Sequence, residues 1–177
     1  MLFWHLPNQI KNYTQKPLHF IARILDQQTS NSLYDHLKVK NWINAISSGL
    51  YASSTFFSVF RIEITLTEQG LTHSNDVIQH VYECLHMIRN MVENDRAEWL
   101  FHEYAQLNKN SFQWLEKNSP SKYASTLAKR MQHYPANDVL FAPFRMDEFN
   151  KKEVLDILDL LTPQNMRYEY FKFSLTK

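Results

Sequence analysis

The 177 residues carry 19 lysine and arginine side chains against 18 aspartate and glutamate, so the formal net charge is +1. This balance gives no electrostatic reason to expect a nucleic acid or an anionic membrane as partner, and no apolar run is long enough to span a bilayer. The single cysteine, Cys84, excludes an internal disulfide and favours a reducing compartment, for which we expect the cytoplasm. Gly49 and Gly70 are the only glycines, which excludes a glycine-rich phosphate-binding loop.

The first 66 residues alternate between strand and helix patterns. Residues 3–6 predict a short strand, Pro17 opens a helix, and residues 32–40 predict a second helix. Residues 42–50 predict a strand that ends at Gly49. The clearest strand is 56–66, in which one face carries Phe56, Phe60, Ile62, Ile64 and Leu66 and the other carries Arg61, Glu63 and Thr65. This alternation predicts a sheet with one face packed against helices.

The rest of the chain is mostly helical. Residues 75–90 form an amphipathic pattern whose apolar stripe is Val77, Val81, Cys84, Leu85 and Ile88. Three further helices are expected to begin at Asp95 with Glu98, at Ser119-Pro120, and at Asn150 with Glu153. Residues 166–175 return as a strand. This order predicts one α+β domain over residues 1–177, with a mostly antiparallel sheet covered by helices.

Two stretches nearly match zinc-peptidase motifs. His80-Val-Tyr-Glu-Cys84 differs from HxxEH at its last position, and residues 102–106 (HEYAQ) differ from HExxH in the same way. A catalytic zinc needs three protein ligands and an open position, and no distal third ligand stands out. Because Cys84 lies in the apolar stripe of its helix, we interpret it as a small core residue beside a surface histidine and glutamate.

Several stretches in the same order resemble the second domain of the pitrilysin/insulin-degrading-enzyme family of zinc metallopeptidases, most closely its nardilysin branch. They are LPNQIKNYTQKPLHFIARIL (6–25), SLYDHLKVKNWINAISSGL (32–50), STFFSVFRIEITLTEQGLTH (54–73), KYASTLAKRMQHYPANDVLFAPFRMDEF (122–149) and LLTPQNMR (160–167). The resemblance runs along nearly all of the chain. It implies an α+β domain of the kind that is repeated in pitrilysin-type metallopeptidases.

The resemblance also implies that catalysis and peptide anchoring belong to different domains. In the family, the zinc motif belongs to the first domain, and the second domain helps to wall a substrate chamber and to anchor the N-terminal end of a peptide. We therefore expect no cofactor in this chain, with zinc in the full-length family enzyme, and no catalytic residues. The corresponding peptide-binding residues would be Ser48 and Gly49 on the strand 42–50 and His19 on the neighbouring helix. There a peptide would add as an extra strand.

This sequence departs from the family in the turn after that helix. The family usually has a glycine-rich turn of the form HEGxGS, whereas residues 27–32 read QQTSNS, and only Ser32 is kept. Ala22 and Asp26 also stand at positions that are often glycine. Because glycine permits the closest backbone approach, these changes bear on how a peptide would be held.

Two functions follow as alternatives. The chain is either a non-catalytic middle domain, as a fragment of a metalloendopeptidase, or a stand-alone binding or regulatory protein. The first would take peptide substrates and the other domains of the same peptidase as partners. The second would bind peptides by its sheet edge or pair with a full-length relative. Neither alternative predicts hydrolysis by this chain alone.

Overall fold

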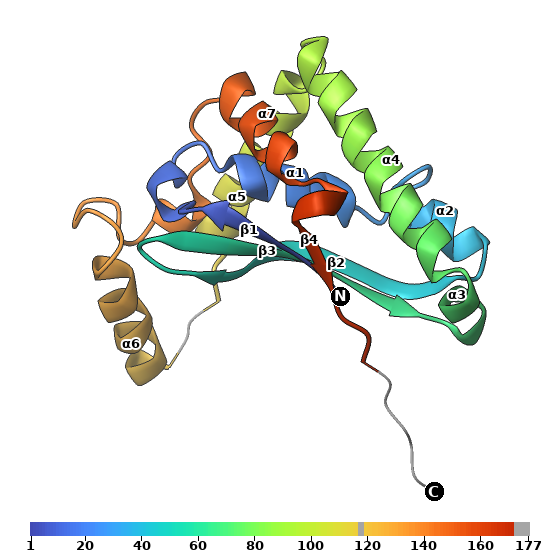
Figure 1. The fold of residues 1–177 in the computed structure, drawn as a ribbon. Coiled ribbons are helices and arrows are strands. Elements are labelled where there is room, and N and C mark those ends of the chain that lie inside the picture. The colour runs from blue at the N-terminus through green and yellow to red at the C-terminus, as the bar shows by residue number, and fades with distance from the viewer. Residues whose placement is uncertain (117–118, 172–177) are drawn as a thin grey trace, which may run out of the picture.

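The computed structural model describes residues 1–116 and 119–171, which form one antiparallel sheet and a layer of helices (Figure 1). The strand order is β2-β3-β1-β4, and every neighbouring pair is antiparallel. The strands are β1 Leu2–Pro7, β2 Ile43–Ser53, β3 Phe57–Leu66 and β4 Met166–Tyr168. The expected fold class, α+β with a mostly antiparallel sheet covered by helices, is confirmed.

The helix layer lies on one face of this sheet (Figure 1). The α-helices of the described residues are α1 Pro17–Leu25, α2 Leu33–Val39, α3 Glu68–Thr72, α4 Ser74–Glu93, α5 Glu98–Gln113, α6 Pro120–Met131 and α7 Lys151–Leu160. The short α3 follows β3, and α6 does not belong to the layer. Single 3-10 turns occupy Ile10–Asn12, Ala142–Phe144 and Pro163–Asn165. Local capping fixes several starts: the Ser32 hydroxyl accepts from the Asp35 N–H, and the Asn150 side chain accepts from the Glu153 N–H. Pro17 occupies the first turn of α1, as expected.

The core lies between the sheet and the helices. Trp4 of the inner strand β1, Phe20 of α1 and Phe60 of β3 are fully buried there. The Trp4 indole donates its N–H to the Thr162 carbonyl oxygen at 3.1 Å, so the large buried ring leaves no unpaired donor. The predicted stripe of α4 is buried at Val77, Val81, Leu85 and Ile88 and packs into this core, with Cys84 partly buried beside it.

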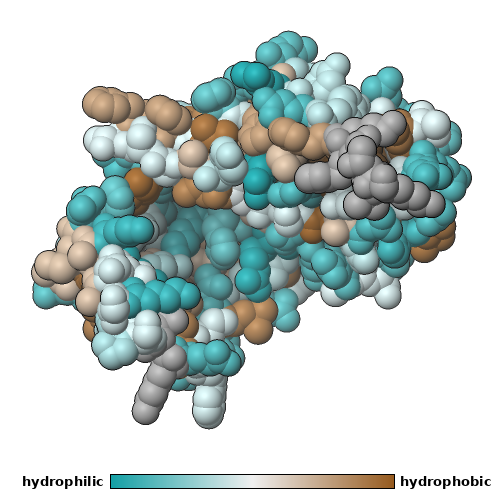
Figure 2. All heavy atoms as spheres, turned by 90° about the horizontal axis from the view of Figure 1, so that it is seen from below, coloured by the Kyte–Doolittle hydropathy of each residue, from teal (hydrophilic) through white to brown (hydrophobic). Residues whose placement is uncertain are grey.

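On the other face of the sheet, the described residues form no helix layer. The Arg61 and Glu63 side chains pair across this face at 3.0 Å, and the Arg61 guanidinium lies 4.8 Å from the centre of the Tyr51 ring. Phe3 meets the same Tyr51 ring edge-on, at a centroid distance of 5.7 Å. Figure 2 shows this side of the molecule, hollowed, with a mostly hydrophilic floor. The alternation predicted for β3 is therefore confirmed, with Phe60 and Ile62 facing the helices.

α6 stands apart from the layer and has no buried residue. The apolar side chains that the sequence placed on it, Tyr123, Leu127 and Met131, are exposed or half-buried. No helix within residues 1–116 and 119–171 combines the length and apolar character needed to cross a membrane.

Several sequence expectations need correction. Phe56 is 88% exposed because it lies in the turn before β3 rather than on the strand's inner face. Asp95 does not cap α5: its φ is 56°, the N-cap residue is Ala97, and the Asp95 carboxylate instead pairs with the Lys151 ammonium at 2.7 Å. β2 continues past Gly49 to Ser53. β4 ends at Tyr168, and positions 172–175 of the expected last strand lie outside the described residues.

Candidate functional site

β2 is an outer strand of the sheet. It pairs with β3 on one side, and no described strand pairs with its other side. An unpaired strand edge presents N–H and C=O groups that can bond to an added strand. Gly49 lies on this strand with a φ of 155°, and nothing would come within 4 Å of a Cβ built there. A small cavity of about 120 Å³, lined by Ser47, Ser48, Gly49, Leu50, Tyr51 and Arg61, opens beside it.

Ser48 joins this strand to the end of α1. Its hydroxyl donates to the Ala22 carbonyl oxygen at 2.8 Å, and its backbone N–H points to the Asp26 carboxylate at 3.4 Å. Since the Ser48 N–H reaches α1 rather than β3, it faces the unpaired side of β2. Ala22 and Asp26 therefore both contact the expected peptide-anchoring strand.

His19 lies elsewhere on α1. Its side chain is exposed, yet the protein atoms that crowd the ring, with the cations of Lys16 and Arg23, lower the pKa of His19 to about 4. A hydrogen bond with the Asn108 side chain of α5 opposes that shift. These neighbours come from α1 and α5 and not from β2. Ser48 and Gly49 are adjacent residues of β2, whereas the described neighbours of His19 are Lys16, Arg23 and the Asn108 side chain of α5.

Sequence reasoning did not include Asp26 or Arg61 among the site residues. Asp26 is half-buried at the C-terminal end of α1, and burial raises the pKa of its carboxyl group, against the hydrogen bond from Ser48. The sequence held one signal for Asp26, namely an aspartate where the resemblance led us to expect glycine. Arg61 appeared only as one of the polar residues on the outer face of β3.

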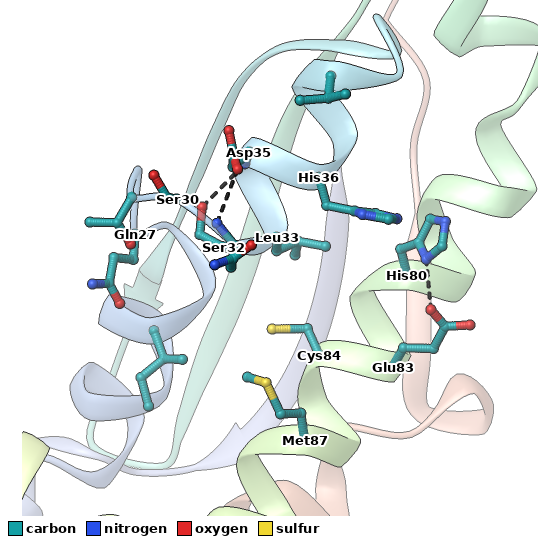
Figure 3. A pocket seen from close by; sticks show the side chains of 14 residues that line it. Gln27, Ser30, Ser32, Leu33, Asp35, His36, His80, Glu83, Cys84 and Met87 are labelled. Carbon is teal, nitrogen blue, oxygen red and sulfur yellow. Dashed lines mark hydrogen bonds and ion pairs between the residues drawn. The ribbon is translucent and has the colours of Figure 1, made fainter.

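The residues of the near-miss motif on α4 border a second cavity, of about 640 Å³, between the end of α1, α2 and α4 (Figure 3). Cys84 and Met87 point into it, while Glu83 lies beside His80. The His80 ring is fully engaged: Nδ1 lies 2.6 Å from the Glu83 carboxylate and Nε2 lies 2.9 Å from the Lys40 ammonium. Because an ammonium can only donate, Nε2 is the acceptor, and Nδ1 carries the proton that is donated to Glu83.

This arrangement does not fit zinc. The lone pair of His80 that a metal would need is occupied by Lys40, and burial raises the pKa of the Cys84 thiol to about 11, which disfavours the thiolate that binds metal. Within the described ranges, no three His, Cys, Asp or Glu side chains are grouped so as to hold a metal ion. The second near-miss fits no better, since His102 is exposed and lies 3.6 Å from the carboxylate of Glu98 on the preceding turn.

The comparisons with known protein families divide the chain into two parts. Residues 1–101 match the model described as the peptidase M16 inactive domain, and residues 112–174 match the middle or third domain of peptidase M16. The first match covers more than half of the chain. The segment between the two matches lies within α5 and has no separate fold of its own.

Curated relatives agree with these matches. The chain is 32% identical to human insulin-degrading enzyme over 157 residues, which is 89% of this chain and 15% of that protein. It is 29% identical to the nardilysin-like protein of Arabidopsis thaliana, over 98% of this chain and 17% of that protein. Rat nardilysin is 30% identical over 91% of this chain and 14% of its own length. The chain thus spans about a sixth of these relatives.

A solved structure supports the fold. The crystal structure of pitrilysin superposes with a TM-score of 0.87 at 22% identity, over 94% of this chain and 18% of that one. At this identity the likeness speaks for the fold alone. Together with the family-model matches, the two sets of relatives establish what the ordered sequence stretches suggested, and the chain belongs to the M16 peptidase family, in a region of the inactive type.

Proposed function

We propose that this chain is a non-catalytic part of a pitrilysin/insulysin-type zinc metalloendopeptidase, in which it lines the substrate chamber and anchors peptides at the β2 edge. The observation that carries this proposal is the match of residues 1–101 to the inactive domain of the family, on a fold in which no described strand pairs with the outer side of β2. The chemistry of zinc hydrolysis would belong to another part of a longer protein, because residues 80–84 do not fit the metal.

The open face of the sheet supports the role in a chamber wall. It is hollowed and polar, and its Arg61–Glu63 pair and the Tyr51 ring offer both charge and an aromatic surface to a passing peptide. The β2 edge borders this face, and Gly49 leaves free space beside the backbone there. A peptide bound at the edge would therefore extend along the hollowed side.

Residues 1–177 are proposed to act as one domain, although two family models divide them. β4, from the part that matches the middle-domain model, pairs with β1, from the part that matches the inactive-domain model, through Leu2 with Tyr168 and Trp4 with Met166. α7 of the second part packs on α4 and α1 of the first, and its residues Val154 and Ile157 are buried in the common core. Neither part would keep its core if it were separated from the other.

The native size of the polypeptide tests whether this chain is part of a longer peptidase. An antibody against residues 1–177 would be used on an extract of the source, with the purified 21.2 kDa chain as size marker. A band several times larger supports a domain of a longer peptidase. A single band at the marker position would overturn that part, and would favour a stand-alone protein that binds peptides or pairs with a full-length relative.

Hydrogen exchange followed by mass spectrometry tests the proposed anchoring site without a mutation. A peptide that adds to β2 must protect amides of Ile43–Ser53 that face its open side, and at Ser48 it must replace the 3.4 Å bond to Asp26. Protection confined to β2 and its neighbours supports the edge as the binding site. Protection confined to residues 27–39 and 80–87, around the larger cavity, would place binding elsewhere and remove the edge from the proposal.

A further inference from the structure

We propose that Asp26 is a specificity-determining residue of the β2 edge, and that it favours peptides which place a positively charged group beside Ser48. This inference rests on the proposed function, because it concerns which peptides the edge accepts. The charged group is an ammonium or a guanidinium, and it can come from a peptide amino terminus or from a lysine or arginine side chain.

The position of Asp26 is fixed by contacts on both sides. It ends α1, where its backbone N–H donates to the Ala22 carbonyl oxygen at 3.0 Å. The Ser48 hydroxyl donates to that same carbonyl at 2.8 Å, which fastens β2 to the end of α1. The carboxylate is thereby held against the open side of β2, 3.4 Å from the Ser48 N–H that an added strand would use.

The carboxylate lacks a close cation. Within the described part of the chain, no lysine, arginine or histidine nitrogen forms an ion pair with Asp26, in contrast to the pairs made by Asp138, Asp147 and Asp159. Arg23, three residues earlier on the same helix, acts on the Asp26 charge from beyond ion-pair distance, and its guanidinium lies over the Tyr104 ring, 5.0 Å from the ring centre. The long hydrogen bond from the Ser48 N–H and the distant Arg23 charge compensate this half-buried carboxylate only in part, and a cation brought by a ligand would compensate it further.

This charge makes the edge selective. A carboxylate directed at a strand edge repels the carbonyl oxygen of an incoming strand, and charged residues at edges commonly prevent pairing with other chains. A cationic group near Ser48 reverses that effect, because it pairs with Asp26 while the rest of the peptide bonds to the backbone of β2.

The test compares three peptides of one strand-forming sequence, measured by fluorescence anisotropy. The first is neutral and N-acetylated, the second has a free amino terminus, and the third is N-acetylated with one lysine. Each is titrated against the 177-residue chain, against Asp26→Asn, and against Asp156→Asn. The Asp26→Asn variant keeps an oxygen acceptor for the Ser48 N–H but loses the charge. Asp156, on α7 and away from the β2 edge, gives a control with the same change in net charge.

We expect at least one cationic peptide to bind the unmodified chain roughly threefold to tenfold more tightly than the neutral peptide, as for a partly desolvated charge pair. Asp26→Asn should abolish that ratio, Asp156→Asn should keep it, and added salt should reduce it. A preference for the free amino terminus alone assigns the peptide ammonium, and a preference for lysine alone assigns a side chain. Thermal melting of both variants is measured beside the titrations, and we expect their Tm values to equal that of the parent chain.

Three results would overturn the inference. Equal binding of all peptides by the parent chain, or a preference that survives in Asp26→Asn, would show that Asp26 selects nothing. Tighter binding of every peptide by Asp26→Asn, to the same extent, would make the carboxylate a mere block of the edge. In each of these cases the peptides still bind and the proposed anchoring function stands. If no peptide binds the parent chain or either variant, the anchoring function falls as well.

Discussion

Replacement of Gly70 by alanine should destabilise the protein, although it lies in a helix where alanine is normally preferred. A Cβ at Gly70 would lie 1.8 Å from the Trp42 carbonyl oxygen and 2.7 Å from the carbonyl carbon. Both atoms belong to the backbone, so no side-chain rotation can relieve the overlap. The same oxygen accepts the Thr67 N–H at 3.0 Å, and the Trp42 ring stacks on His73 at a centroid distance of 4.7 Å.

The expected magnitude follows from the parts that must move. Overpacking of a close contact costs about 1 to 3 kcal/mol, and loss of the Thr67 hydrogen bond costs about 1 kcal/mol more. The gain in helix propensity from glycine to alanine returns about 1 kcal/mol at most. The net loss is therefore about 1 to 3 kcal/mol of unfolding free energy, or on the order of 5 °C in Tm for a chain of this length.

Urea denaturation followed by circular dichroism measures this change. Gln69→Ala is the matched control, because Gln69 is the exposed residue before Gly70 on α3, and its replacement should stay within about 0.5 kcal/mol of the parent. If Gly70→Ala were as stable as the parent chain or more stable, α3 could not lie as close to Trp42 as the structure has it.

Three further predictions concern a cap, a thiol and a buried amine. Asn150→Ala should lower the unfolding free energy by about 1 kcal/mol, because it removes the bond from the Glu153 N–H at the start of α7; unchanged urea denaturation would contradict the cap. Cys84, whose pKa burial raises to about 11, should react with Ellman's reagent at pH 8 more slowly in the folded chain than in urea, and equal rates would contradict its burial. Burial lowers the pKa of Lys16 from 10.5 to about 8, so the unfolded chain binds more protons between those values and stability should rise over that range. Lys16→Met should flatten that rise in denaturation curves measured from pH 8 to 10, and an unchanged slope would assign it to other groups.

Much of the fold can be predicted from local sequence patterns. The alternation along β3 places Phe60 and Ile62 inward because successive strand residues face opposite sides. The stripe of α4 and the caps at Ser32 and Asn150 depend on residues within one or two helical turns. Patterns of this range survive in almost any tertiary setting, which is why they could be recognised before the structure. The family resemblance came from the same source, as an ordered set of local stretches.

The candidate site could not be derived in that way. Whether β2 is an inner or an outer strand depends on the strand order, which local alternation does not encode. The Ser48 hydroxyl reaches a carbonyl 26 positions earlier, at Ala22, and its N–H reaches Asp26. His80 was interpreted as a surface histidine, but its contact with Lys40, 40 positions away along the chain, could not be derived from the sequence.

The sequence by itself determined the order of helices and strands, most of their apolar faces and the family resemblance, because each is set by neighbouring residues or by their order. Only the tertiary structure decided that Gly70 must lack a side chain, that Lys40 occupies the His80 nitrogen, and that Asp26 faces the open edge of β2. These three are contacts between segments distant in the sequence. Such contacts form only where packing brings the two segments within a few ångströms, so the order of residues along the chain does not reveal them.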